Sequence, residues 1–133
     1  MRLFKRCIMK QLISLFLFAA MISSAHAEGI VRTELKRADL TGKDMDIIVT
    51  LVEVPPGDTI DRHIHPGEET VYVLEGATVG LPDGKQIPFP TGAATINARD
   101  VPHAGFKVVG DKTLKMLTVH IVDKGKPVTE LVK

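Results

Sequence analysis

The sequence predicts an all-β fold, a small sandwich or barrel made of short strands. After residue 27, turn signals recur every eight to twelve residues, which is typical of such folds. In the same part of the chain, no window longer than ten residues has convincing helical periodicity. The segment 45–54 alternates, with partly apolar residues on both sides, which suits a strand in a two-sheet sandwich or barrel.

The first 27 residues have the pattern of a secretory signal peptide. A basic start is followed by an apolar run at 12–22 and by a small-residue motif at 25–27. The apolar run is too short to span a bilayer well, so we expect cleavage after Ala27 and no retained anchor. The sequence therefore predicts a cleaved signal peptide at 1–27 and one secreted domain at 28–133.

The composition of the predicted domain excludes several classes of function. Cys7 and all three serines of the chain precede residue 28, so the domain has no disulfide and no serine or cysteine nucleophile. The domain is mildly acidic, because four of the 17 basic residues lie in the leader and all 16 acidic residues follow it. It lacks the basic, aromatic surface that nucleic-acid binding requires. It also has no apolar run long enough to cross a membrane.

Turn residues divide the domain into a regular series of predicted strands. In order, they are 45–54, 59–65, 70–75, 77–81, 85–89, 93–97, 103–109 and 113–122. Turns are expected at 55–57 and 110–112, and a bend at Gly76. Pro82-Asp83-Gly84 is a strong hairpin signal between two of the strands.

Three histidines and a glutamate form the candidate metal site. His63 and His65 alternate on one strand, so both side chains project to the same face, about 7 Å apart. Pro66-Gly67 is turn chemistry that can return Glu69 to that face. His103 follows far downstream. Together these groups can fill most of the coordination sphere of a divalent transition metal.

Three nearby residues allow other interpretations. Glu68 could be the carboxylate ligand, but spacing and strand parity favour Glu69. Asp61 shares the parity of the histidines, and could either hold a histidine N–H or lie at the mouth of the barrel. For His120, we expect a satisfied or surface histidine in preference to one that lines the pocket.

The chain resembles a small single-domain cupin over roughly residues 33–126. The first motif of that family is a glycine, five residues, H-x-H, three or four residues, a glutamate, six residues and a glycine. Its fixed positions are met here by Gly57, His63, His65, Glu69 and Gly76. The second motif is degenerate: Gly92 and His103 fit, while Ala98, Asp100 and Lys107 stand where proline, glycine and asparagine are expected.

The resemblance implies a jelly-roll barrel with His63, His65, Glu69 and His103 as the metal ligands. It also implies a homodimer, for which the segment 30–37 is the candidate exchange region, since sheet edges need covering. Together with the export signal, it predicts a bacterial periplasmic protein.

The expected cofactor is one divalent transition metal, and the donor set accepts zinc, iron, manganese, nickel or copper. The leading hypothesis is a metal-dependent enzyme acting on a small molecule, with a dioxygenase-like oxidoreductase first and an isomerase or lyase next. The alternative is a non-catalytic protein that binds metal or a small, sugar-like ligand. A metal that only staples the fold ranks last. The sequence assigns no catalytic residue.

Overall fold

The computed structural model describes residues 29–132, so the predicted signal peptide lies outside the described residues. In this range the secondary structure is all strand, which confirms the predicted all-β class. No helix within it is long and apolar enough to span a membrane. The strands are β1 (Val31–Asp39), β2 (Met45–Val54), β3 (Thr59–Ile60), β4 (His63–Ile64), β5 (Gly67–Glu75), β6 (Ala77–Gly80), β7 (Gln86–Phe89), β8 (Ala94–Asn97), β9 (Phe106–Val109), β10 (Leu114–Asp123) and β11 (Glu130–Leu131).

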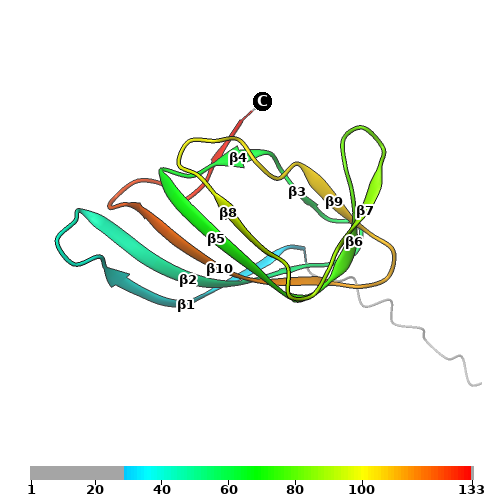
Figure 1. Ribbon diagram of the computed structural model, residues 1–133, viewed down its shortest axis with the longest axis horizontal. Helices are drawn as coiled ribbons and strands as arrows, with labels where there is room; N and C mark the ends of the chain where they lie inside the picture. Colours follow the sequence, from blue (N-terminus) through cyan, green and yellow to red (C-terminus); the bar gives the residue numbers. More distant parts are fainter. Residues whose placement is uncertain (1–28, 133) are drawn as a thin grey trace, which may run out of the picture.

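The strands form two main antiparallel sheets (Figure 1). The larger sheet has the order β1-β2-β10-β5-β8, and the smaller one has the order β3-β9-β6-β7. The short strands β4 and β11 pair with each other near the C-terminus. The buried apolar cluster draws on both sheets, which shows that their inner faces pack together. Its members are Val52, Val54, Ile60, Val71, Val73, Ala77, Val79, Val108, Leu114 and Met116.

Strand β10 is the centre of the larger sheet and pairs along its length with β2 and β5. Its residues alternate between buried and half-buried from Leu114 to Asp123, because successive side chains of a strand point to opposite faces. The buried face carries Thr118 and His120 among apolar residues. Two polar side chains of β10 thus point into the space between the two sheets.

Most predicted strands agree with the structure to within a few residues. The segment 59–65 is the main exception, since it is divided into β3 and β4 at Asp61 and Arg62. The division has a topological cause: β3 pairs with β9 in the smaller sheet, whereas β4 pairs with β11. Strands β1 and β11 were not among the predicted strands. The predicted hairpin is confirmed, with the Leu81 amide donating to the Lys85 carbonyl at 2.8 Å.

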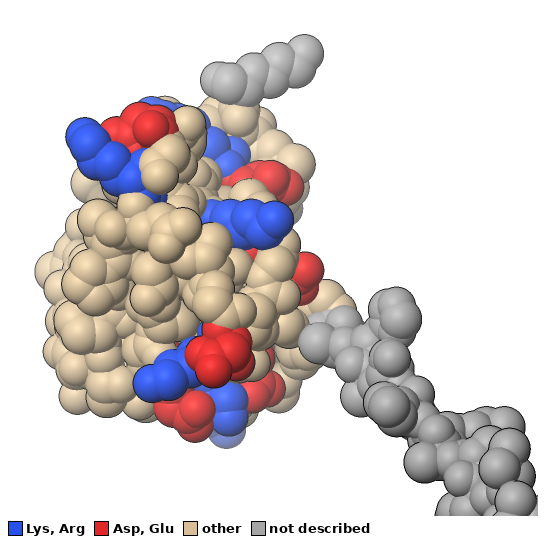
Figure 2. All heavy atoms as spheres, turned by 90° about the vertical axis from the view of Figure 1, so that its right-hand side faces the viewer, with Lys and Arg blue, Asp and Glu red and all other residues tan. Residues whose placement is uncertain are grey.

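The surface of the molecule carries charges of both signs. On the face shown in Figure 2, basic and acidic side chains lie next to one another. Exposed ion pairs such as Lys85–Asp83 and Arg37–Glu34 illustrate this mixing. Such exposed pairs stabilise the fold little, so the fold depends on the apolar cluster and on strand pairing.

Two glycines are required where the chain turns from one strand to the next. A Cβ on Gly67 would lie 1.9 Å from the Ile121 carbonyl oxygen, and one on Gly76 would lie 2.6 Å from the Thr91 amide nitrogen. Both obstacles are backbone atoms of neighbouring segments, which cannot rotate away. Close backbone packing therefore explains why glycine occupies these positions.

We predict that Gly67→Ala lowers the free energy of unfolding by about 2 kcal/mol or more, because the added methyl overpacks against the β10 backbone. Gly80→Ala is the matched control, since its Cβ would meet the Val109 side chain at 3.4 Å and the Lys107 carbonyl oxygen at 3.8 Å, both ordinary contact distances or close to them. Urea unfolding followed by circular dichroism measures both. Equal losses in the two variants would contradict this explanation.

Candidate metal centre

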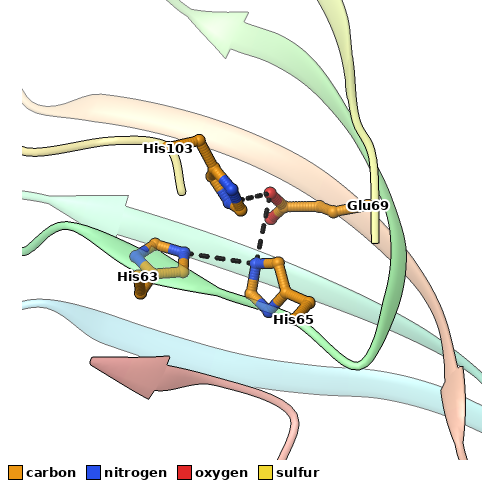
Figure 3. A group of neighbouring side chains, drawn as sticks. All are labelled: His63, His65, Glu69 and His103. Atoms are coloured by element: carbon orange, nitrogen blue, oxygen red, sulfur yellow. Dashed lines mark hydrogen bonds and ion pairs between the residues drawn. The ribbon is translucent and has the colours of Figure 1, made fainter. Parts of the chain in front are cut away.

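Three segments of the chain bring the candidate ligands together, and Figure 3 shows their four side chains next to one another. His63 is in β4, His65 follows it, and Glu69 lies in β5. His103 comes from the loop before β9. A backbone bridge joins the two distant histidines: the His63 amide donates to the His103 carbonyl at 3.1 Å, and the reverse bond is 3.0 Å. Strand pairing thus fixes the relative position of residues forty positions apart in the chain.

The four side chains point toward one another. The Nε2 atoms of His63 and His65 lie 3.2 Å apart. From Glu69 Oε2, the Nε2 atoms of His65 and His103 lie at 3.5 Å and 3.2 Å. One potential ligand atom from each of the four residues lies within 4.8 Å of the others. The residues that the sequence singled out therefore form one compact cluster that could hold a metal ion.

Backbone carbonyls orient all three histidine rings. The Nδ1 atoms of His63, His65 and His103 hydrogen-bond to three such oxygens, those of Asp61 at 2.6 Å, Val128 at 2.5 Å and Val101 at 2.9 Å. Because a carbonyl oxygen only accepts, each Nδ1 must carry the proton. Each Nε2 is then free to present its lone pair to the centre, as a metal ligand requires.

The Asp61 side chain does not take the first of its two expected roles, which was to hold a histidine N–H. Its carboxylate is exposed, while its main-chain carbonyl accepts the His63 Nδ1–H. The carboxylate therefore does not hold the histidine, and the backbone of the same residue does. The alternation of side chains along a strand could not reveal this contact, because the contact is made by a backbone atom.

Of the two neighbouring glutamates that could be the carboxylate ligand, Glu69 is buried and Glu68 is exposed on the other face of β5. The Asn97 amide donates to Glu69 Oε2 at 2.7 Å, and His120 Nε2 lies 3.2 Å from Glu69 Oε1. Burial raises the pKa of the Glu69 carboxyl, but its contacts with His120, His65 and Asn97 lower it by more, so the net pKa lies well below its usual range. The cluster thus contains a buried negative charge.

Two of the histidines have shifted acidities. Burial lowers the pKa of His63 below its ordinary value, although the Asp61 carbonyl opposes this shift. For His65, burial also lowers the pKa, but Glu69 and the Val128 carbonyl raise it by more, and the net shift is upward. A proton therefore competes with a metal for His65 up to a higher pH than for an ordinary histidine, and the metal affinity falls as the pH is lowered.

The donor chemistry of the cluster fits a divalent cation. His103 Nε2 is buried and forms no hydrogen bond with any of residues 29–132. The His63 and His65 Nε2 atoms face each other at 3.2 Å. Lone pairs that face one another repel unless a shared proton or cation lies between them. Three imidazoles and one carboxylate supply such a cation with ligands that suit zinc, iron, manganese, nickel or copper.

His120 is a functional candidate that the sequence reasoning placed wrongly. It is not a surface histidine, because its side chain is only 7% exposed. Its ring centroid lies 4.5 Å from that of His65. The alternation with Met116 and Thr118 on the buried face of β10 was the available signal. The sequence alone could not show that this face is directed at Glu69.

The degenerate second motif retains the backbone geometry of the loop. Asp100 stands where the motif has glycine, and it adopts a φ of 57°, in the left-handed region that favours glycine. Its amide donates to the His65 carbonyl at 3.0 Å. The Val101 amide bonds to the Ala98 carbonyl, while Lys107 is exposed on β9. The loop therefore still places His103 in the cluster.

A cavity of about 490 Å³ opens beside the cluster, a size suited to a small organic ligand. The four candidate ligands, Asn97 and His120 line one part of it. Further polar groups come from Arg32, Glu34, Arg37, Thr50, Thr95, Thr118 and Thr129, and apolar side chains from both sheets and from two loops line much of the rest. The apolar side chains are Ile48, Val52, Ile60, Val71, Phe89, Ala104, Phe106, Met116 and Val128.

Comparisons with known proteins agree with this fold. The family model described as a cupin domain matches residues 50–120. The polyketide cyclase RemF from Streptomyces resistomycificus is 28% identical, with a TM-score of 0.58 over 95% of this chain and 87% of that chain. A double-stranded β-helix protein from Klebsiella pneumoniae is 18% identical, with a TM-score of 0.60 over 80% and 87% of the two chains.

A third similar structure is the DMSP lyase DddQ from Ruegeria pomeroyi. It is 18% identical, with a TM-score of 0.59 over 86% of this chain and 57% of that chain. At such low identity, the likeness to DddQ and to the Klebsiella protein concerns the fold alone. A comparison with curated protein sequences gives no match.

We predict that Glu69→Gln weakens zinc binding by at least about 100-fold, since loss of a ligand should exceed the effect of losing an outer hydrogen-bond partner. Glu68→Gln is the control, because it is the same substitution at the neighbouring residue, whose side chain lies on the exposed face of β5. Competition with a chromogenic chelator measures both affinities. A loss of similar size in Glu68→Gln would contradict the assignment of Glu69.

We also predict that Asn97→Ala lowers zinc affinity by roughly 10- to 100-fold, because the Asn97 amide orients the Glu69 carboxylate. Thr95→Ala on the same strand lines the cavity without a hydrogen bond to Glu69, and should change the affinity less than about twofold. The same chelator competition applies. An unchanged affinity in Asn97→Ala would remove this residue from the site.

Proposed function

Because this chain belongs to the cupin-domain family, we propose that it is a metal-dependent enzyme that acts on a small organic molecule. The observation that carries the proposal is the convergence of three imidazoles and one ionised carboxylate beside an apolar cavity. This pairing supplies both a site for a reactive metal and a space for a substrate next to it.

His63, His65, Glu69 and His103 would hold the metal. When bound, a divalent metal supplies Lewis acidity, or redox chemistry if it is iron, manganese or copper. With four protein ligands, a five- or six-coordinate ion would leave one or two positions for substrate. The backbone carbonyls hold the rings in place, and Asn97 and His120 orient Glu69, so the site is organised before a substrate arrives.

The first reaction class in this proposal is dioxygenase-like oxidation of an oxygen-rich substrate. The donor set supports it, because neutral imidazoles with one carboxylate suit a redox metal. The second class is non-redox chemistry at a carbonyl group, as in an isomerase, lyase or cyclase. The likeness to a polyketide cyclase at 28% identity supports this second class. Both classes use the same ligands and the same cavity.

Export and self-association are parts of the same proposal. The leader pattern supports transfer to a bacterial periplasm. The edge strand β1 supports a homodimer, since all nine of its residues are exposed and one of its edges has no partner strand among residues 29–132. Light scattering of the purified domain would measure its mass, and a monomer at micromolar concentration would contradict the dimer.

We predict that the protein loaded with iron, manganese, nickel, zinc or copper converts at least one member of a panel of enediols, flavonols and diketones. Product analysis by mass spectrometry, with and without dioxygen, separates the two reaction classes. His63→Ala should abolish turnover, because it removes one ligand. Arg62→Ala is the control, since this exposed neighbour is not among the cavity-lining residues and should leave turnover unchanged.

If no metal and no substrate class gives product, while ligands still raise the melting temperature of the metal-loaded protein, the protein is a binder and not an enzyme.

We predict that a chelator lowers the melting temperature but leaves the far-ultraviolet circular dichroism at 25 °C unchanged. The apolar cluster and the central strand pairings lie largely outside the metal site, so the fold stands without the metal, and binding adds stability by mass action. Collapse of the spectrum on chelation would show instead that the metal is a structural staple.

A further inference from the structure

Strand β10 carries a short polar stripe into the cavity beside the metal-ligand cluster. On its buried face, Thr118 and His120 interrupt an otherwise apolar series. The register with β5 sets His120 opposite Glu69. Thr118 comes two residues earlier on the same face, so it lies about 7 Å farther along the strand from the cluster.

Both side chains are deeply buried, but they differ in their polar contacts. Thr118 is 2% exposed and His120 is 7% exposed. Counting partners from residues 29–132, the Thr118 hydroxyl and His120 Nδ1 form no hydrogen bond, whereas His120 Nε2 lies 3.2 Å from Glu69 Oε1. Both residues line the cavity. Since buried polar groups in proteins are nearly always paired, the groups without a hydrogen bond are suited to pair with a molecule that enters the cavity.

The surroundings of the stripe limit what that molecule can be. Val52, Val71 and Met116 lie next to it along the larger sheet and line the cavity. Phe89 and Phe106 line it from the smaller sheet, with their rings edge to face and 6.1 Å between centroids. These walls favour hydrocarbon or a flat ring, although Thr50 lies opposite Thr118 on β2 and also lines the cavity.

We propose that the Thr118 hydroxyl binds a second oxygen function of the substrate, while its first oxygen functions face the metal-ligand cluster beside His120. The inference rests on the proposed function, because it takes the cluster as the first anchor. It assigns the ligand class: a compact, flat or apolar body with oxygens at two places about 7 Å apart. A sugar falls outside this class, because its ring carries hydroxyls all round and the Val52, Val71 and Met116 side chains near Thr118 would leave part of that ring without partners.

Two commercial hydroxypyranones test this assignment directly. Allomaltol and kojic acid chelate metals through the same neighbouring hydroxyl and ketone oxygens. They differ in one group on the far side of the ring, a methyl in allomaltol and a hydroxymethyl in kojic acid. The ratio of their affinities for the zinc-loaded protein therefore measures the contribution of the distal hydroxyl alone.

Isothermal titration gives the two affinities, and metal analysis after titration confirms that zinc is retained. We expect wild-type protein to bind kojic acid about three- to tenfold more tightly than allomaltol, the range of one net hydrogen bond. Thr118→Val keeps the shape but removes the hydroxyl, and should bring the ratio close to one. Thr118→Ser keeps the hydroxyl and should preserve the preference.

Thr70→Val is the matched control, because this threonine lies on the exposed face of β5, and it should retain the wild-type ratio. A ratio near one in the wild-type protein, or an equal preference in Thr118→Val, overturns the inference while leaving the metal site intact. Failure of the zinc-loaded protein to bind either compound contradicts the proposed function itself. Glucose binding at comparable affinity would overturn the assigned ligand class.

Discussion

The hydrogen bonds from three histidine Nδ1 atoms to main-chain carbonyls are the constraint on which the site depends. Each bond fixes the protonated nitrogen of a ring and turns its other nitrogen toward a common centre. The carbonyls belong to Asp61, Val101 and Val128, which lie in three separate segments of the chain. The site therefore exists only when the loops around β4, β9 and β11 are in register with one another.

Strand pairing supplies that register. The bridge between His63 and His103 joins the two segments that carry them, and the pairing of β10 with β5 sets His120 beside Glu69. The large antiparallel sheet thus acts as the rigid support, while ligands come from its inner face and from the loops at one end. Burial of an ionised carboxylate among imidazoles is costly in isolation, and a bound cation would offset that cost.

The fold class, most strand positions and the grouping of His63, His65 and Glu69 were accessible from the sequence, because alternation, turn residues and ligand spacing are local signals. His103 was assigned through the resemblance to the second cupin motif. Three features were not accessible from the sequence. The division of 59–65 into β3 and β4 depends on a change of pairing partner. The carbonyl of Asp61 acts through the backbone, which side-chain patterns do not report. The approach of His120 to Glu69 depends on the register between β10 and β5, a contact between segments far apart in the chain.

Anomalous X-ray diffraction from crystals grown with zinc tests the central claim most directly. The account predicts one strong anomalous peak in each molecule at the cluster, about 2.0–2.2 Å from the Nε2 atoms of His63, His65 and His103 and from a Glu69 oxygen. A peak bound through Nδ1 atoms would contradict it, as would zinc found only at other sites while these four side chains are free of metal.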